Sequence, residues 1–230
     1  MTEYQGWADT EWMHSVGHGR LDLPKPYYER DGITIFHGDC REILPQLEPV
    51  DLVLTDPPYG IAKIWVGGSE KHGWTKANAE AALRNQWDKE PPSADLIDAV
   101  VAKGTHAVVW GGNYFALPLS RGWLVWNKPE RNFSLGEAEL AWTTRDNVIR
   151  VRDDVRSEPT REHPTQKPLA LMRWCVDLFP DAVTILDPFM GSGTTLRAAK
   201  DLGRKAIGIE IEERYCEIAA KRLSQEVLAL

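Results

Sequence analysis

The chain has 230 residues, which suits one large domain, and its 43% hydrophobic and 27% charged residues exclude a disordered chain. The net charge of −7 argues against a nucleic-acid partner, because phosphate binding usually leaves a basic surface. Residues 1–20 lack the basic start and apolar core of a signal peptide, and the longest charge-free stretch, 104–120, is too short to span a bilayer. The three cysteines match neither a disulfide framework nor a zinc site, so we expect a cytoplasmic protein without a metal.

The order of the predicted elements indicates an α/β fold. Residues 1–30 show no periodicity and carry scattered aromatic side chains, so we expect an N-terminal arm followed by a domain over 31–230. Apolar runs of strand length cover 33–37, 51–55, 106–111, 122–127, 138–143, 183–187 and 205–210. Helical patterns cover 41–47, 93–103, 168–178, 193–202 and 212–228. This alternation predicts a doubly wound, Rossmann-like sheet of about seven strands, with one antiparallel edge strand where no helix separates two strands between 122 and 143.

Two stretches, 60–92 and 128–161, interrupt the alternation, and long irregular segments inside a domain are usually functional. The first carries Lys63, Lys71, His72, Trp74 and Lys76. The second carries Arg145, Arg150, Arg152, Arg156 and Arg161, interleaved with acidic residues. Such a pattern fits either a solvated mixed-charge surface or a contact with phosphates.

A glycine-rich turn joins an apolar strand to a helix near the C-terminus, with the sequence Asp187-Pro188-Phe189-Met190-Gly191-Ser192-Gly193-Thr194-Thr195. The two glycines allow a tight turn and a close approach of ligand to backbone. A nucleoside triphosphate is unfavoured, because no lysine follows them. Glu210 ends the next strand, 17 residues after Gly193, where an acidic residue of a Rossmann unit holds ribose hydroxyls, and Ile211 beside it can pack on a base. The glycine-rich turn and Glu210 together favour a site for a nucleoside-type cofactor over a turn that binds no ligand.

A second motif, Asp56-Pro57-Pro58-Tyr59, follows the strand predicted at 51–55. Ligands of open α/β sheets bind at such strand tips. The two prolines stiffen the loop and remove two N–H donors, which leaves the Asp56 carboxylate and the Pro57 carbonyl as acceptors. Two acceptors beside the flat ring of Tyr59 suit the exocyclic amino group of a planar base, whereas the alternative is a proline-rich turn with a packed tyrosine.

Taken in this order, the two motifs resemble those of the S-adenosylmethionine-dependent DNA amino-methyltransferases of the permuted β class, in which the catalytic motif precedes the cofactor motif. His37-Gly38-Asp39-Cys40 resembles the acidic strand tip that holds the cofactor's adenine. The sequence His-Pro-Thr-Gln-Lys-Pro at 163–168 resembles the segment upstream of the cofactor motif. The resemblance spans 32–223, although 128–161 is shorter than the family's target-recognition region often is.

The resemblance implies a methyltransferase sheet, S-adenosylmethionine as cofactor and double-stranded DNA as partner, and it allows a homodimer through the N-terminal arm. Its implied catalytic residues are Asp56, Pro57, Pro58 and Tyr59. Its implied cofactor residues are Asp39, Cys40, Asp56, Lys167, Asp187, Pro188, Phe189, Gly191, Ser192, Gly193, Thr194, Glu210 and Ile211. DNA contacts are expected at Lys63, Lys76, Arg145, Arg150 and Arg152.

The target amino group would bond Asp56 and the Pro57 carbonyl, with its base flipped out of the helix and stacked on Tyr59. Asp in the first motif position favours adenine N6, because Ser is more usual for cytosine N4 in this motif order. Cytosine N4 is the alternative, followed by an RNA methyltransferase and a catalytically silent DNA-binding module. An NAD-dependent oxidoreductase would use the same glycine turn but leave the Asp56 motif unexplained.

Overall fold

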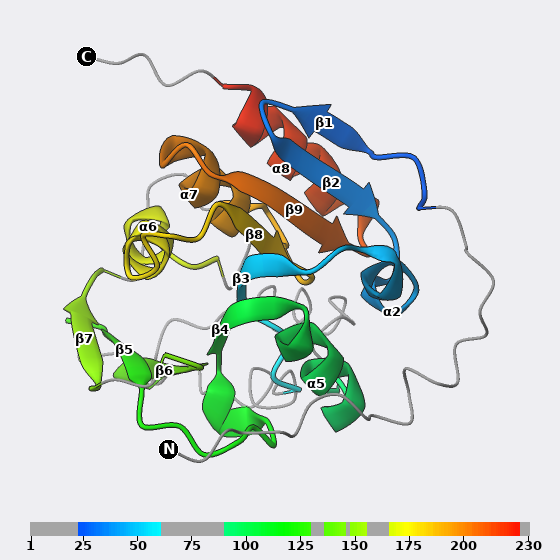
Figure 1. Ribbon diagram of the computed structural model, residues 1–230. Coiled ribbons are helices and arrows are strands. Elements are labelled where there is room, and N and C mark those ends of the chain that lie inside the picture. The colour runs from blue at the N-terminus through cyan, green and yellow to red at the C-terminus, as the bar shows by residue number, and fades with distance from the viewer. Residues whose placement is uncertain (1–22, 61–89, 130–135, 146–147, 156–165, 226–230) are drawn as a thin grey trace, which may run out of the picture.

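The computed structural model describes residues 23–60, 90–129, 136–145, 148–155 and 166–225. These residues form one sheet in the order β1-β2-β9-β8-β3-β4-β6-β5-β7 (Figure 1). The strands are β1 (Tyr28–Arg30), β2 (Ile33–His37), β3 (Val50–Thr55), β4 (Gly104–Trp110), β5 (Trp123–Asn127), β6 (Ala138–Thr143), β7 (Arg150–Asp153), β8 (Thr184–Asp187) and β9 (Lys205–Glu210). The helices are α2 (Cys40–Ile43), α5 (Ala94–Ala102), α6 (Leu169–Asp177), α7 (Thr194–Asp201) and α8 (Glu213–Ser224), with short 3-10 helices at Leu44–Gln46 and Gly112–Tyr114.

The predicted α/β class is confirmed, and each predicted strand is present within two residues of its expected bounds. The strand count is nine rather than about seven. β1 lies inside the segment predicted as an arm, because Asp31 and Gly32, both with positive φ, turn the chain back as a two-residue hairpin. β7 lies inside the predicted irregular stretch 128–161, where its alternating arginines obscured a strand that pairs with β5. The last helix ends at Ser224, sooner than predicted.

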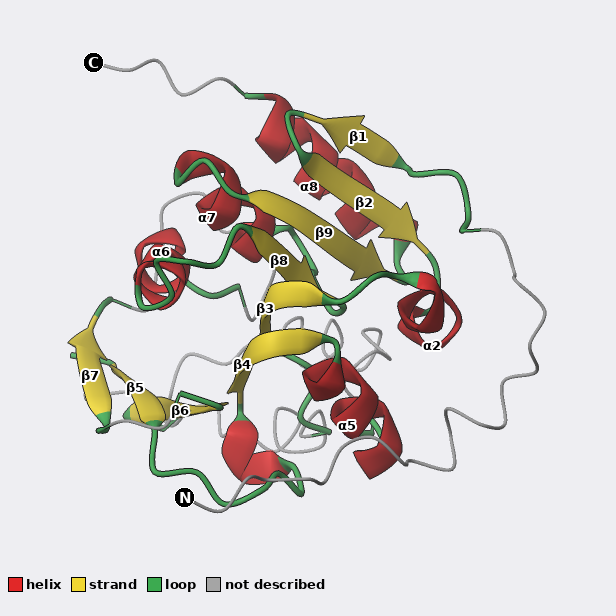
Figure 2. Cartoon of the chain, in the orientation of Figure 1, coloured by secondary structure: helices red, strands yellow, loops and turns green. Residues whose placement is uncertain are grey.

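Helices cover both faces of the sheet, as Figure 2 shows. Leu52 and Leu54 of β3 pack in one core cluster with residues of α6, α7 and α8. Val53, on the opposite face of the same strand, packs in a second cluster with α2 and α5. Strands buried on both faces explain the continuous apolar runs in the sequence. In the described part of the chain, no helix is both long and apolar enough to cross a membrane.

Strand direction determines where the functional edge of the sheet lies. β2, β9, β8, β3 and β4 are mutually parallel, so their carboxyl ends meet at one edge. β6 runs antiparallel to both β4 and β5, and β1 is an antiparallel strand at the margin of the sheet. The loops that leave the five parallel strands therefore share one side of the molecule, where ligands of open α/β sheets bind.

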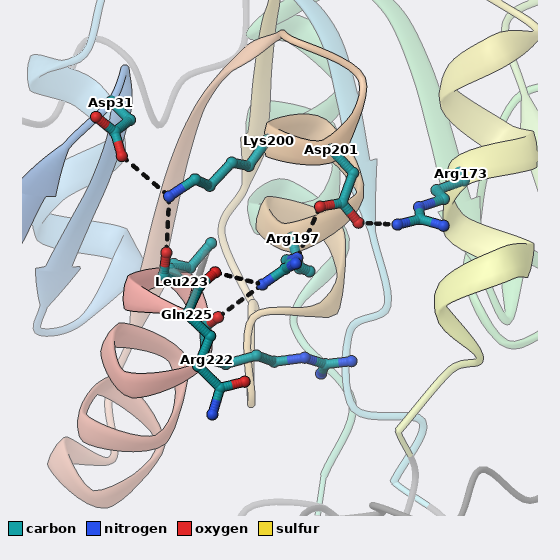
Figure 3. A network of polar contacts seen from close by, with 8 residues as sticks. All are labelled: Asp31, Arg173, Arg197, Lys200, Asp201, Arg222, Leu223 and Gln225. Carbon is teal, nitrogen blue, oxygen red and sulfur yellow. Dashed lines mark hydrogen bonds and ion pairs between the residues drawn. The ribbon is translucent and has the colours of Figure 1, made fainter. Parts of the chain in front are cut away.

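A polar network ties three helices together on one face of the sheet (Figure 3). Asp201, at the end of α7, accepts hydrogen bonds from Arg197 of the same helix at 2.8 Å and from Arg173 of α6. Arg197 also donates to the backbone of α8, through the carbonyl of Arg222 at 2.8 Å. Lys200 joins the carbonyl of Leu223 to the β1–β2 turn. The network stabilises the helix layer behind the glycine-rich turn.

Candidate active site

Four adjacent parallel strands carry carboxylates at their carboxyl ends. Asp39 follows β2, Glu210 ends β9, Asp187 ends β8 and Asp56 follows β3. All four line one cavity of about 590 Å³. This volume lies within the range of small-molecule and cofactor sites. Residues that are far apart in the sequence thus form one acidic pocket at the edge of the sheet.

The cavity gathers nearly all of the residues implied to hold a cofactor. Those that line it are Asp39, Cys40, Asp56, Lys167, Asp187, Pro188, Phe189, Gly191, Ser192, Thr194, Glu210 and Ile211. Gly193 does not line it, because this residue packs against α8, where an added Cβ would lie 2.8 Å from the Cβ of Ala219. An added Cβ at Gly191 would have nothing within 4 Å, which leaves open space beside the turn.

Hydrogen bonds fix the orientation of three of these carboxylates. Glu210 accepts from the backbone N–H groups of Gly191 at 2.9 Å and Glu212 at 2.8 Å, so the tip of β9 holds the glycine-rich turn. Asp187 accepts from the Thr55 hydroxyl at 2.8 Å, and burial raises the pKa of Asp187 to about 6. Asp39 caps α2 and pairs with Arg41, whose hydrogen bonds lower the pKa of Asp39. The pocket therefore combines Asp39, which ionises more readily than an ordinary carboxyl group, with Asp187, which ionises less readily.

The Asp56 carboxylate has a donor on each oxygen. The Tyr59 hydroxyl donates to Oδ1 at 2.5 Å, and the Lys167 ammonium donates to Oδ2 at 2.5 Å. The side chain of Asp56 remains 21% exposed, on the cavity side. Burial raises the pKa of Asp56, whereas the Lys167 ammonium and the Tyr59 hydroxyl oppose that shift. A carboxylate held in this way presents its remaining lone pairs to the cavity as hydrogen-bond acceptors.

Aromatic packing holds the catalytic-motif tyrosine. The Tyr59 ring stacks on Tyr114 at a centroid distance of 4.8 Å and contacts Phe115 edge-on. Of the four residues in the motif, Asp56 and Pro58 line the cavity, whereas the buried Pro57 and the half-buried Tyr59 do not. Tyr114 therefore covers one face of the Tyr59 ring.

The structure brings together two charged residues that the sequence analysis did not connect with Asp56. Glu139 of β6 accepts a bond from Lys167 at 3.1 Å and pairs with Lys128. Lys167, expected beside the cofactor, does line the cavity, but its ammonium points to Asp56 and Glu139. A signal for Glu139 was present in the sequence, since a lone carboxylate stood in an otherwise uncharged strand.

The residues expected to contact DNA are only partly described. Lys63, Lys71, His72, Trp74, Lys76, Arg156 and Arg161 lie outside the described residues. Arg150 is exposed on β7, and the neighbouring Arg152 pairs with Asp154 at 3.2 Å. Arg145 follows β6 at the end of the sheet opposite Asp56 and donates to the carbonyl of Leu178 at 2.7 Å. This position does not favour the predicted contact between Arg145 and DNA beside the flipped base.

Within the described ranges, no group of three or more His, Cys, Asp or Glu side chains is arranged to hold a metal ion.

All three cysteines of the chain are buried free thiols. Burial raises the pKa of Cys40, which lines the cavity, to about 12. A thiol that stays protonated is a poor nucleophile, so Cys40 is not favoured in that role.

Comparison with known proteins relates the chain to DNA-modifying enzymes. A family model described as DNA methylase, of the N6/N4 type, matches residues 108–221. Type II methyltransferase M.ScaI of Streptomyces caespitosus is 30% identical over 276 positions, covering 90% of this chain and 86% of the relative. Type II methyltransferase M2.LlaDCHI of Lactococcus lactis subsp. cremoris is 27% identical over 268 positions, covering 93% and 97%.

Two solved structures share the fold. The M1.HpyAVI–SAM complex is 25% identical, covers 84% of this chain and 100% of its own, and gives a TM-score of 0.52. The cytosine-N4-specific PvuII DNA methyltransferase is 19% identical, covers 89% and 91%, and gives a TM-score of 0.58. At that identity the second likeness concerns the fold alone, and both place the described sheet among methyltransferase structures.

Proposed function

The chain belongs to the N6/N4 family of DNA methylases, and within that family's chemistry we propose that its target is the N6 amino group of adenine. It is a DNA methyltransferase, and S-adenosylmethionine is its cofactor. Family membership leaves no support for an NAD-dependent oxidoreductase. The base, the residue roles and a homodimer through the N-terminal arm are proposals, and residues 1–22 of that arm lie outside the described part.

The cavity fits this cofactor in size and charge. When bound, S-adenosylmethionine supplies an electrophilic methyl group on a cationic sulfonium. Asp39, Asp187 and Glu210 give the pocket the negative charge that such a cation requires, and the open space beside Gly191 leaves room against the backbone. Glu210 at the tip of β9 occupies the place where Rossmann units hold ribose hydroxyls. We therefore assign the ribose to Glu210 and the adenine end to Asp39.

The residues of the catalytic motif act on the target amino group. Asp56 and the Pro57 carbonyl would accept hydrogen bonds from its two N–H groups, which would orient the nitrogen lone pair toward the methyl group that the cofactor supplies. Positive charge develops on the nitrogen during the attack, and the adjacent Asp56 carboxylate stabilises it. Asp56 then accepts the proton that the methylated nitrogen loses. The base reaches Asp56 only after it leaves the DNA stack, and Tyr59 supplies the ring on which it packs.

One observation carries the proposal for adenine, namely the aspartate that opens the motif. Asp in this position favours adenine N6 in the family that the motifs resemble, whereas Ser is more usual for cytosine N4. Position 56 is Asp, and both of its oxygens are held by donors at 2.5 Å, as suits a residue that orients an amino group.

The test is methyl transfer from labelled S-adenosylmethionine to unmethylated duplex DNA, followed by digestion to nucleosides and mass spectrometry. We expect label on N6-methyladenine. Label on N4-methylcytosine would overturn the base assignment but keep the mechanism. Label on RNA alone would overturn both the base and the nucleic acid proposed.

The matched variant is Asp56→Asn, which keeps the side-chain volume but removes the negative charge. We expect it to lower methyl transfer by a factor of about 100 or more, because the developing charge on nitrogen loses its counter-charge. Cofactor affinity, measured by calorimetry, should remain close to that of the wild type. Undiminished transfer by this variant would remove Asp56 from the mechanism.

A further inference from the structure

A row of alternating charges leads from the catalytic loop into the sheet. It consists of Asp56, Lys167, Glu139 and Lys128, each paired with the next. We propose that Lys167 and Glu139 are positioning residues: Lys167 keeps Asp56 ionised and aims it at the target amino group, and Glu139 holds Lys167 in place. The inference rests on the catalytic role proposed above for Asp56, and it gives Lys167 a task other than binding cofactor.

The ammonium of Lys167 has no proton left for a ligand. An ammonium carries three N–H donors. Those of Lys167 face Asp56 Oδ2 at 2.5 Å, the Tyr59 hydroxyl at 3.2 Å and Glu139 Oε2 at 3.1 Å. The side chain is only 5% exposed, although it lines the cavity. Lys167 thus bonds Asp56 and Tyr59 of the catalytic loop on one side and Glu139 of β6 on the other.

Glu139 fixes the far side of Lys167. It lies opposite Trp126 in the pairing of β6 with β5, and its Oε1 pairs with Lys128 while its Oε2 pairs with Lys167. The Lys128 ammonium in turn lies 4.6 Å from the centre of the Trp126 ring. A buried charge is tolerated only when it is paired, so two carboxylates and two ammonium groups stabilise one another here. The sheet itself thereby sets the position of the group that holds Asp56.

The surroundings of Asp56 make the sign of the electrostatic effect predictable. The groups that face it are Tyr59 from its own loop, Lys167 from the segment before α6, Glu139 of β6 and Asp187 of β8. Among these four, Lys167 is the cation. Without Lys167, burial and two carboxylates would all favour protonated Asp56, which has lost its charge and one acceptor site. Without the negative charge of Glu139, the ionised form of Asp56 would instead become more favourable.

The experiment compares pH profiles of single-turnover methyl transfer, with labelled S-adenosylmethionine and duplex DNA, for the wild type, Lys167→Met, Lys167→Arg and Glu139→Gln. We expect the acid limb of the Lys167→Met profile to move up by about one pH unit or more. Lys167→Arg should restore much of the shift, because the charge returns. Glu139→Gln should move the limb in the opposite direction. Cofactor affinity should change little in all three variants.

Lys103→Met is the matched control, since Lys103 is also a partly buried lysine, bonded to the carbonyl of Leu47 at 2.6 Å and outside the cavity lining. Its profile should equal that of the wild type. Equal profiles for Lys167→Met and wild type would overturn the positioning role, as would weaker cofactor binding with an unchanged profile. If Lys167→Met fails to fold, the inference is overturned when the acid limb of the Glu139→Gln profile moves to higher pH. If Asp56→Asn retains full activity, both this inference and the catalytic proposal are wrong. If Asp56→Asn loses activity but the profile of Lys167→Met equals that of the wild type, only this inference is wrong.

Discussion

Among single residues, Tyr59 of the Asp56–Tyr59 loop packs against a glycine that lies outside the recognised motifs. Gly111 follows β4 with a φ of +68°, and an added Cβ would lie 2.1 Å from Cε1 of Tyr59. The Tyr59 ring therefore packs directly on the Gly111 backbone. Since the Tyr59 hydroxyl bonds Asp56, any displacement of this ring also disturbs the Asp56 carboxylate.

Gly111→Ala should consequently reduce methyl transfer as well as stability. The new methyl group must push Tyr59 away from Asp56, in addition to a backbone strain of about 1 kcal/mol for a residue with positive φ. Gly203→Ala is the matched control, because Gly203 has the same φ of +68° but nothing within 4 Å of an added Cβ. We expect both variants to lose stability in urea unfolding and Gly111→Ala alone to lose turnover. Equal turnover in the two variants would contradict the role of the ring.

At the scale of secondary-structure elements, α7 joins the helix layer through its last residue. A carboxylate at the C-terminal end of a helix is unfavourable next to the helix dipole. Asp201 is nevertheless there, only 6% exposed, because Arg173 and Arg197 neutralise it from two helices (Figure 3). The same helix begins at the glycine-rich turn, so its attachment to α6 and α8 also steadies that turn.

Asp201→Ala should destabilise the protein, because Arg197 is left as a buried cation without its carboxylate. We expect a loss of about 3 kcal/mol in the free energy of unfolding, measured by urea denaturation. Glu217→Ala provides the control, since Glu217 pairs with Lys221 on the exposed side of α8. Its unfolding midpoint should not change. An Asp201→Ala midpoint equal to that of the control would show that the network adds no stability.

At the scale of the whole molecule, the strand order creates the acidic pocket. Asp39, Asp56, Asp187 and Glu210 are dispersed along the chain, yet β2, β9, β8 and β3 are neighbours in the sheet. Burial in this site raises the pKa values of Asp56, Asp187 and Glu210. These carboxylates can attract a bound cation, but in the empty pocket they ionise less readily than exposed carboxylates do.

Cofactor affinity should therefore depend on pH. Asp187 in the free protein has a pKa of about 6, and a bound cation favours its ionised form. Below about pH 6 the binding equilibrium includes loss of this proton, so the dissociation constant should rise up to about tenfold for each unit of decreasing pH. Calorimetry should show less dependence on pH for Asp187→Asn. A wild-type affinity that is constant from pH 5 to 7 would contradict the prediction.

The same pKa shift has the opposite consequence for the stability of the cofactor-free protein. The folded state holds the Asp187 proton more tightly than an unfolded chain, whose carboxyl has the ordinary pKa of 3.8. The contribution of Asp187 to the free energy of unfolding is therefore full below about pH 4 and is lost as the pH rises through about 6. Thermal unfolding of wild type and Asp187→Asn across this range measures it.

Sequence alone predicts the fold class, the bounds of seven strands and of the helices, and the two motifs that contribute to the cavity. These follow from local information, namely apolar runs, helical periodicity and glycine or proline turns, which act within a few residues of one another. It did not reveal β7, whose exposed, arginine-containing strand is held by its pairing with β5. Nor did it reveal the hairpin at Asp31 and Gly32, although that turn carries a local signal.

Which charges meet depends on the tertiary structure. Lys167 lies 111 residues from Asp56 along the chain, and Glu139 lies on a strand that the connecting loops bring beside the catalytic motif. Nothing in the local sequence distinguishes a lysine that bonds a cofactor from one that holds a carboxylate. The difference arises from strand order and burial, because a buried ammonium must find its partners among whichever groups the folded sheet places next to it.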